Sequence, residues 1–522
     1  MTPSEYKKFK DVRDFILKNR NDAKELSTVC FPVIDNFNWA SDWFDVYARG
    51  NGNTCLEGPT LLHEWASLSY EEVSIRSSEI ANDLQQKGML CGDKVIVEAP
   101  SSIEVYLVIL AALKIGVVII PIHFGLDSLA FEDRIVVASP EWIITDRNLS
   151  CHTTTAKILP LFKLFSETNR GKNYVRSFRS SNLPAYGCFT SGTTGRPKLV
   201  LHSQQTHGIA HLSSLAWNDI DPEGRHLNIS SPGWAKFFWS SLLVPLTAGA
   251  TVVIKPDDLS ATDLIHFCNT HSVSSLCAPV PFLTKALSDS SEEPSSLLDI
   301  TTVGEAVPEQ LKSDCQERWD LYIRTGYGQS EATGIMGELK SRLGVLSVLP
   351  GYKVRVKSYP NEAAGRLEYK SFSNGSFNGY IKENGLESPT LNAEGWQWSG
   401  DYASGTPGEK DFKILGRGDD VFRVNGHIVS PSEIEHVLCR HSKVLSAAVF
   451  PHPDCQGLLQ ARAHIVLSES DKHLNSASEI HSWINHQLPG DVNISQLTVV
   501  DNIPMSINGK IQRKLIATNY QT

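Results

Sequence analysis

A run of hydroxyl residues and glycines that ends in a lysine lies between Thr190 and Lys198, with the sequence TSGTTGRPK. Its glycines let backbone N–H groups approach phosphate oxygens, while the hydroxyls and the lysine add donors and a positive charge. The spacing does not fit G-x-x-x-x-G-K-[S/T], which disfavours a P-loop ATPase or kinase. Taken alone, the run is either a Ser/Thr/Gly surface turn or a polyphosphate-binding loop. The loop would use Thr190, Ser191, Gly192, Thr193, Thr194, Gly195 and Lys198.

Five further segments carry residues suited to nucleotide chemistry, although each is weak alone. VGEAVP places Gly304 and Glu305 at a strand end, where a base can lie against backbone, but an ordinary strand-to-helix turn reads the same way. TGYGQSEATG offers Tyr327 for stacking on a base and Glu331 for a magnesium ion. The other three offer a carboxylate for a ribose diol, an arginine for ribose or phosphate, and a lysine after an Asn-Gly turn: Asp401, Arg417 and Lys510.

Composition limits the classes of protein that can position these residues. A chain of 522 residues predicts two to four domains or subdomains, and 41% hydrophobic with 20% charged residues is ordinary for a globular enzyme. The net charge of −10 argues against a broad nucleic-acid surface and favours a cytosolic protein. Ten cysteines without a C-x-x-C pair suggest neither a disulfide framework nor a zinc site. The charged amphipathic N-terminus lacks the apolar core of a secretory signal, so we expect no export.

Apolar strand-like runs alternate with helical patterns through the first two-thirds of the chain, which predicts α/β layers with buried parallel strands. The most apolar run, Leu107 to Ile122, contains Lys114 and Gly116, so it reads as a buried helix running into a strand and not as a membrane span. Short alternating strands over about 345–415 predict a β-rich subdomain. A new start at Asp419 predicts a boundary between a domain of residues 1–418 and a small α+β domain of residues 419–522.

Together and in this order, the six motifs resemble the adenylate-forming superfamily from about Phe37 to Lys514. That superfamily contains acyl-CoA synthetases, firefly luciferases and adenylation domains of peptide synthetases. The resemblance implies a large α/β domain with a β-rich subdomain and a small mobile C-terminal α+β domain. It also implies that a carboxylate attacks ATP to give an acyl-adenylate, from which a thiol, normally that of coenzyme A, displaces AMP. ATP, Mg²⁺ and coenzyme A would be the cofactor and co-substrates.

The resemblance also implies roles for individual residues. Lys510 would bridge the carboxylate and the α-phosphate, while Glu331 and Thr190 would help to hold Mg²⁺. Asp419 would be the hinge about which the small domain swings, and the loop Val424, Asn425 and Gly426 would meet the pantetheine of coenzyme A. The AMP moiety would be bound by Gly304, Glu305, Tyr327, Gly328, Gln329, Ser330, Asp401 and Arg417.

Within the superfamily, SPGWAKFFWSSLLVPLTAG resembles medium-chain acyl-CoA synthetases and acetyl-CoA synthetases, whereas RVNGHIVSPSEIEHVL is similar to medium-chain and benzoate-type CoA ligases. By the same resemblance the acyl pocket would be lined by Trp234, Phe237, Val303, Gly326 and Thr333. Its aromatic wall favours an aryl or a short- to medium-chain acid, although Trp234 and Phe237 also fit plain core packing. The chain departs from the family in reading SGD for TGD and in carrying Ser330 for a threonine, and both changes keep the hydroxyl. It also lacks the usual lysine-rich loop between Glu338 and Gly351, which leaves the acyl acceptor open.

The sequence therefore predicts an AMP-forming carboxylic acid–CoA ligase. The partners would be a small-molecule acid, ATP and coenzyme A, with neither nucleic acid nor membrane, and with a homodimer and a cytoplasmic location as further expectations. The first alternative is an adenylating enzyme that passes the acyl group to an amine or to a carrier-protein thiol. The second, a non-catalytic ligand-binding descendant, is opposed by the joint presence of Lys198, Glu331, Asp401, Arg417 and Lys510.

Overall fold

The computed structural model describes residues 3–147, 154–166, 174, 180–191, 197–290, 292–358, 362, 364–372, 377–382, 385–424, 427–454, 456, 458–468, 476–488, 492–505 and 511–519. Contacts divide the chain into two compact units. The first unit is Met1–Lys353 with Lys370–Gly395, and the second is Val354–Tyr369 with Trp396–Thr522. The domain boundary expected at Asp419, between residues 1–418 and 419–522, stays a prediction.

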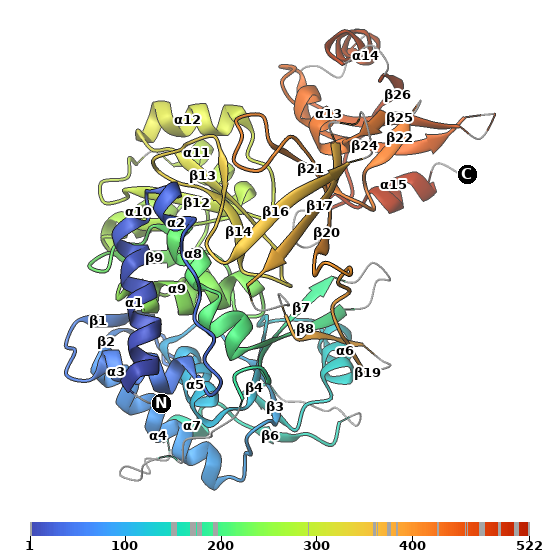
Figure 1. The fold of residues 1–522 in the computed structure, drawn as a ribbon. Coiled ribbons are helices and arrows are strands. Elements are labelled where there is room, and N and C mark those ends of the chain that lie inside the picture. The colour runs from blue at the N-terminus through green and yellow to red at the C-terminus, as the bar shows by residue number, and fades with distance from the viewer. Residues whose placement is uncertain are drawn as a thin grey trace. The chain divides into compact units, whose positions relative to one another are not determined.

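One sheet of the first unit carries the predicted phosphate loop (Figure 1). Strands β7, β4, β3, β5 and β6 are parallel neighbours, and β8, β18 and β19 continue the sheet in antiparallel fashion beyond β7. The strands are β3 (Lys94–Glu98), β4 (Val118–Ile122), β5 (Trp142–Thr145), β6 (Lys157–Leu159), β7 (Pro184–Ser191), β8 (Pro197–Ser203), β18 (Gly379–Lys382) and β19 (Gly385–Glu387).

The other sheet of the first unit has the order β15-β14-β13-β12-β11-β9-β10-β1-β2. Its inner strands from β13 to β1 are parallel, whereas β14, β15 and β2 run antiparallel to their neighbours. The strands are β1 (Thr54–Pro59), β2 (Trp65–Ser69), β9 (Arg225–Asn228), β10 (Thr251–Val253), β11 (Ser275–Cys277), β12 (Asp299–Val303), β13 (Ile323–Gly328), β14 (Gly334–Glu338) and β15 (Leu346–Val348).

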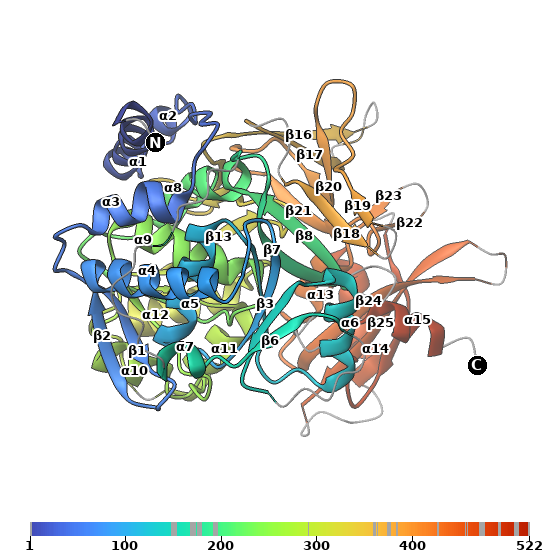
Figure 2. The same cartoon turned by 90° about the horizontal axis from the view of Figure 1, so that it is seen from below.

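Helices cover both faces of each sheet in the first unit (Figures 1 and 2). The largest core lies between the two sheets and contains α1 (Pro3–Asn19), α4 (Tyr70–Gln86), α5 (Ile103–Ile115), α8 (Leu212–Asn218), α9 (Val244–Ala248) and the π-helical segments η1 (Trp39–Phe44), η2 (Gln204–Ile209) and η3 (Phe237–Leu243). The outer faces pack on α6 (Ser128–Ala138) and on α10 (Leu264–Thr270), α11 (Val280–Asp289) and α12 (Glu309–Trp319). Short helices α2 (Ala23–Leu26), α3 (Asp45–Ala48) and α7 (Lys163–Ser166) complete the unit.

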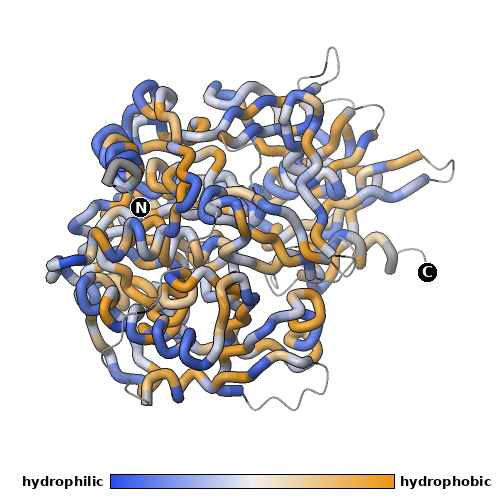
Figure 3. Tube along the Cα trace, turned by 60° about the horizontal axis from the view of Figure 1, so that its bottom comes forward, coloured by the Kyte–Doolittle hydropathy of each residue, from blue (hydrophilic) through white to orange (hydrophobic). Residues whose placement is uncertain are grey.

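Successive side chains of an inner strand point into two different buried cores, which explains why these strands are apolar throughout. In β3, Val95 and Val97 point into the large core while Ile96 points into the core under α6. Helix α5 is buried on all sides, ends at Gly116 with a φ of 76°, and leads directly into β4. The predicted helix-to-strand reading of Leu107–Ile122 is therefore confirmed, and no helix among the described residues is long and apolar enough to span a bilayer. Helix α1 is drawn largely in the hydrophilic colour in Figure 3, as its charged sequence predicts.

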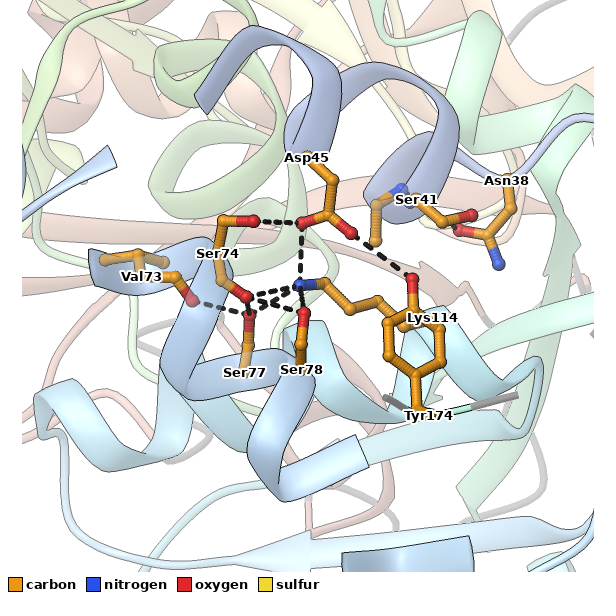
Figure 4. A network of polar contacts seen from close by, with 10 residues as sticks. Asn38, Ser41, Asp45, Val73, Ser74, Ser77, Ser78, Lys114 and Tyr174 are labelled. Carbon is orange, nitrogen blue, oxygen red and sulfur yellow. Dashed lines mark hydrogen bonds and ion pairs between the residues drawn. The ribbon is translucent and has the colours of Figure 1, made fainter. Parts of the chain in front are cut away.

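A buried ammonium group ties three helices of this core together (Figure 4). Lys114 of α5 is fully buried, and its Nζ lies 2.7 Å from Asp45 Oδ1 of α3. The same Nζ donates to the hydroxyls of Ser77 and Ser78 on α4, at 2.8 and 2.9 Å. Burial lowers the pKa of Lys114 and the Asp45 carboxylate opposes this effect. The charge that interrupts the apolar run is thus compensated by a complete set of oxygen partners.

The second unit is built from short sheets and small helices around its own core. Four strands have the order β16-β17-β20-β21, in which β20 runs antiparallel to both β17 and β21. Strand β22 pairs with β23, and β25 lies between β24 and β26. The elements are β16 (Tyr352–Ser358), β17 (Ala364–Ser371), β20 (Gln397–Ser404), β21 (Lys413–Arg417), β22 (Phe422–Val424), β23 (His427–Val429), β24 (Val444–Pro453), β25 (Leu459–Leu467), β26 (Ile494–Val499), α13 (Pro431–Leu438), α14 (Ser476–Gln487) and α15 (Arg513–Asn519). The mixed α/β and α+β fold class predicted from the sequence is confirmed.

Candidate active site

The predicted phosphate loop connects two antiparallel strands of the first unit. Thr190 is the register partner of Lys198, and Ser191 is the partner of Pro197, so the run forms the end of the β7–β8 hairpin. Strand β7 is buried over most of its length because it lies between β4 and β8. Residues Gly192, Thr193, Thr194 and Gly195 lie outside the described residues, so the loop itself is defined here only by its two flanking strands.

Tyr380 connects Lys198 with Glu331. It lies on β18, which pairs with β8, and its hydroxyl donates a 2.8 Å hydrogen bond to Glu331 Oε1. The ammonium of Lys198 lies 5.7 Å from the centre of the Tyr380 ring, within cation–π range. Two residues predicted from separate motifs are therefore brought together by a third that the sequence analysis did not identify. The strand pattern of GYIKENG was visible in the sequence, but its pairing with β8 was not.

The loop Gly328–Gln329–Ser330–Glu331 begins at the end of β13 and is contacted by side chains of β7 and β8. His202 Nε2 lies 2.7 Å from the carbonyl oxygen of Ser330, so this nitrogen carries the proton and donates. Burial lowers the pKa of His202 to about 4, which keeps the ring neutral near pH 7. The thiol of Cys188 donates to the same carbonyl at 4.0 Å, and its pKa is raised by burial and then by the Glu331 charge. The two side chains position the loop that carries the carboxylate.

The candidate adenine contacts lie at the ends of neighbouring parallel strands. Gly304 follows β12 with a φ of 108°, a conformation that favours glycine, and Glu305 accepts a hydrogen bond at 3.2 Å from the backbone N–H of Val280, where α11 begins. At the end of β13, Gln329 Nε2 donates to the Tyr327 hydroxyl at 3.3 Å. Since β12 and β13 are adjacent parallel strands, these two predicted segments are neighbours at the carboxyl ends of the strands.

The predicted acyl-pocket residues fall into two groups. Val303 and Gly326 are register partners on β12 and β13, and Thr333 is buried with its hydroxyl 2.7 Å from Ser213 Oγ of α8. In contrast, Trp234 is 41% exposed, whereas Phe237 is buried with its ring 5.4 Å from that of Tyr106. Phe237 thus takes part in core packing, as the sequence analysis allowed.

The second unit carries the predicted ribose-binding pair. Asp401 of β20 is the register partner of Arg417 of β21, and Asp401 Oδ1 lies 3.5 Å from Arg417 Nη1. Asp401 is nearly buried and its backbone N–H donates to Ser399 Oγ at 3.0 Å. Asp419 is exposed in the turn that follows β21. Val424 is fully buried, so only its backbone can face a ligand, while Asn425, Gly426 and Lys510 lie outside the described residues.

An α/β fold that sets a hydroxyl-rich hairpin with a lysine beside a carboxylate on a glycine-rich loop defines a nucleotide-using enzyme. The chain matches the AMP-binding enzyme family over residues 46–366 and the C-terminal domain of AMP-binding enzymes over residues 433–510. It therefore belongs to the AMP-binding enzyme family. The resemblance to the adenylate-forming superfamily is confirmed, as is the predicted enzyme class, an AMP-forming carboxylic acid–CoA ligase that uses ATP and coenzyme A.

Individual relatives agree with this assignment. The chain is 30% identical to 4-hydroxybutyrate–CoA ligase 1 of Metallosphaera sedula, over 96% of this chain and 95% of that protein. It is 27% identical to the mitochondrial acyl-coenzyme A synthetase ACSM5 of Mus musculus, over 92% and 90% of the two chains. The fold is similar to the crystal structure of the anthranilate CoA ligase AuaEII in complex with anthranoyl-AMP. The TM-score is 0.81 at 18% identity, over 95% of this chain and 98% of that one.

Proposed function

We propose that the chain activates a small carboxylic acid in the first unit and then transfers it to coenzyme A. A carboxylate oxygen attacks the α-phosphorus of ATP, a P–O bond forms, and pyrophosphate leaves. The thiol sulfur of coenzyme A then attacks the acyl carbon, loses its proton and expels AMP. The observation that carries the proposal is the contact of Tyr380 with both Lys198 and Glu331, which gathers a cation and a carboxylate beside the predicted phosphate loop.

In this proposal the β7–β8 hairpin binds the β- and γ-phosphates through Lys198 and its hydroxyl residues. Magnesium prefers oxygen ligands and is usually held by one or two carboxylates together with phosphate oxygens and water. Glu331, whose Oε1 is already oriented by Tyr380, and the hydroxyl of Thr190 fit this preference. When bound, Mg²⁺ would offset the negative charge that the phosphates bring into the site.

The remaining roles follow from the family pattern. Asp401 and Arg417 would bind the ribose, and their pairing across β20 and β21 supports a joint role. Lys510 would stabilise the charge that builds up between the carboxylate and the α-phosphate. Asp419 would be the hinge of the small domain, and Val424, Asn425 and Gly426 would contact coenzyme A. AMP would also meet Gly304, Glu305, Tyr327, Gly328, Gln329 and Ser330.

The acid itself is proposed to be an aryl or a short- to medium-chain acid. A curated relative acts on 4-hydroxybutyrate by its name, which supports a short aliphatic acid. The named ligands of the solved structures concern those proteins, because their identity to this chain is too low to support more than the fold. The cytoplasmic location and the homodimer expected from the sequence stay predictions.

The test is a panel of linear C2 to C12 acids and aryl acids, scored by pyrophosphate release with and without coenzyme A, with mass spectrometry of the products. Acyl-CoA formed in proportion to pyrophosphate would support the proposal and identify the acid. Pyrophosphate with acyl-AMP as the only product would contradict the second step and point to an amine or carrier-protein acceptor. Lys510→Ala is the matched control, since it should lose pyrophosphate release while still converting a supplied acyl-adenylate to acyl-CoA.

A further inference from the structure

The guanidinium of Arg513, at the start of α15, contacts three other segments of the second unit. Its Nη2 donates to both carboxylate oxygens of Glu435 on α13, at 2.8 and 2.6 Å. Its Nε donates to the carbonyl oxygen of Val449 on β24 at 3.1 Å. Its Nη1 lies 3.5 Å from Asp420 Oδ2, in the turn that follows β21. Each nitrogen of the guanidinium therefore contacts a different segment, which fixes the first residue of α15 relative to all three.

The contacts of Arg513 with Glu435 and Val449 form a closed and largely buried network. The two charged side chains are 14% and 11% exposed. Glu435 Oε1 also accepts a hydrogen bond at 2.7 Å from the backbone N–H of Val449. Burial raises the pKa of Glu435, and the charge of Arg513 opposes this effect. A lysine has a single nitrogen and no planar fork, so it cannot reproduce the set of contacts that the arginine makes.

The segment that carries Lys510 is closed at its base directly before α15. Lys510 lies outside the described residues, but the residues on either side of its segment are described. Met505 and Ile511 form an antiparallel bridge, and the backbone N–H of Gln512 donates to the carbonyl oxygen of Pro504 at 2.9 Å. Ile511, the residue after Lys510, packs against the small core beside β24. The base of the Lys510 segment is thus continuous with the residue that carries the guanidinium.

The turn that contains Asp420 carries two predicted functional residues, Arg417 for the ribose and Asp419 as the hinge. The backbone N–H of Asp420 donates to the carbonyl oxygen of Arg417 at 3.0 Å. The backbone N–H of Gly418 donates to the carbonyl oxygen of Gly400 on β20 at 2.7 Å, next to the other predicted ribose residue. A contact with the Asp420 carboxylate therefore also fixes a position relative to the predicted ribose site.

We propose that Arg513 is a positioning residue for adenylation, which holds the base of the Lys510 segment at a fixed distance from the turn that carries Arg417. This inference rests on the proposed function, in which Lys510 acts at the α-phosphate and Arg417 binds the ribose. Ribose and α-phosphate belong to one nucleotide, so the two side chains must be correctly spaced. A misplacement of about 1 Å costs on the order of 100-fold in rate. Transfer to coenzyme A does not use Lys510 in the proposed function, so Arg513 affects the first step only.

The experiment measures the two half-reactions separately in Arg513→Lys, Asp420→Asn and the unchanged enzyme, with the acid that the panel identifies. Single-turnover release of pyrophosphate from MgATP reports adenylation, and acyl-CoA formed from the supplied acyl-adenylate reports transfer. Adenylation should slow on the order of 100-fold in Arg513→Lys and several-fold in Asp420→Asn, with transfer changed less than about threefold. Lys443→Met is the matched control, because the 2.7 Å ion pair of Lys443 with Glu479 joins two segments of the same unit that are neither α15 nor the turn after β21.

The outcomes separate this inference from the proposed function. A selective loss of adenylation in Arg513→Lys, with both steps normal in Lys443→Met, supports the positioning role. Equal losses in both half-reactions overturn it, since a general defect of the small domain affects both steps, and so does an unchanged adenylation rate. If thermal melting shows that Arg513→Lys is unfolded, the same comparison in Asp420→Asn decides.

Lys510→Ala identifies a failure of the proposed function itself. A normal adenylation rate in Lys510→Ala removes the role given to this lysine and the inference with it. A loss in Lys510→Ala beside normal adenylation in Arg513→Lys overturns the inference alone and leaves the proposed function intact.

Discussion

Tyr380 offers the sharpest test of how the first unit arranges charge. Its hydroxyl donates to Glu331 and its ring lies under the ammonium of Lys198, so one side chain makes two separable contacts. Tyr380→Phe keeps the ring and removes the hydrogen bond, whereas Tyr380→Leu removes both. Because the residue lies on β18 and not in the phosphate loop, neither change alters the hairpin that carries Lys198.

The expected magnitudes follow from the two contacts. A hydrogen bond to a charged partner contributes about 1.5–3 kcal/mol, and the half-buried position of Tyr380 favours the lower end of that range. About 1.5 kcal/mol corresponds to roughly a 10-fold loss of kcat/KM for MgATP in Tyr380→Phe. A cation–π contact at a partly exposed site adds about 0.5–1 kcal/mol, so Tyr380→Leu should lose a further several-fold.

The assay is pyrophosphate release at saturating acid with MgATP varied. Tyr322→Phe is the matched control, because Tyr322 also bonds a carboxylate, that of Glu338, and belongs to no predicted site segment. If Tyr380→Phe keeps the kcat/KM of the unchanged enzyme within twofold, as the control should, the hydroxyl does not orient Glu331 for catalysis. A loss confined to Tyr380→Leu would assign the whole effect to the ring and reject the role given to the hydrogen bond.

Two further predictions concern stability. Lys114→Met should lower the free energy of unfolding by about 1–3 kcal/mol in urea titrations, because it removes the buried ammonium that bonds the Ser77 and Ser78 hydroxyls and leaves the partly buried Asp45 carboxylate with the Ser74 hydroxyl but without its cation. The exposed Lys10→Met should change the free energy of unfolding by less than about 1 kcal/mol, and equal effects of the two changes would contradict the buried network. Burial lowers the pKa of His202 and of His211 from 6.5 to about 4, so each histidine contributes on the order of 3 kcal/mol to the free energy of unfolding. This contribution is fully present above pH 6.5 and is lost as the pH falls to 4. A melting temperature that stays flat from pH 7 to 4.5 would refute this expectation.

Much of the fold can be read from the sequence because its signals are local. The run from α5 to β4 is apolar on all sides, and Gly116 marks the place where helix gives way to strand. A strand buried on both faces can be predicted from an unbroken apolar stretch of the right length, without knowledge of the strands that pair with it. The pairing of Asp401 with Arg417 also depends on nearby sequence, because the two residues lie on consecutive strands of one antiparallel hairpin.

Tyr380 was missed because its significance depends on a pairing that the sequence does not state. The stretch around it predicts a short strand, and its Gly- and Asn-rich surroundings suggested membership of the small β-rich subdomain. In the structure β18 extends the sheet of β8 instead, which sets Tyr380 beside Val200 and within reach of Lys198. Nothing within a few residues of Tyr380 distinguishes the two pairings, since an edge strand can join any sheet with a free edge.

Gly326 and Gly337, which both lie against the ring of Trp217 from α8, show the same limit more clearly. Gly326 has an adequate local explanation in the loop TGYGQSE, and Gly337 has none, so neither suggests the other. Only the antiparallel register of β13 and β14 sets them opposite one another, and only the docking of α8 supplies the ring that requires both to lack a side chain. A sequence feature that could have pointed there is a glycine without a turn, such as Gly337 directly after the apolar Ile335 and Met336 of β14, since glycine weakens a strand unless something must approach its backbone closely. The residue that needs the space then has to be sought among large side chains on the covering helix, and in this chain that residue is Trp217.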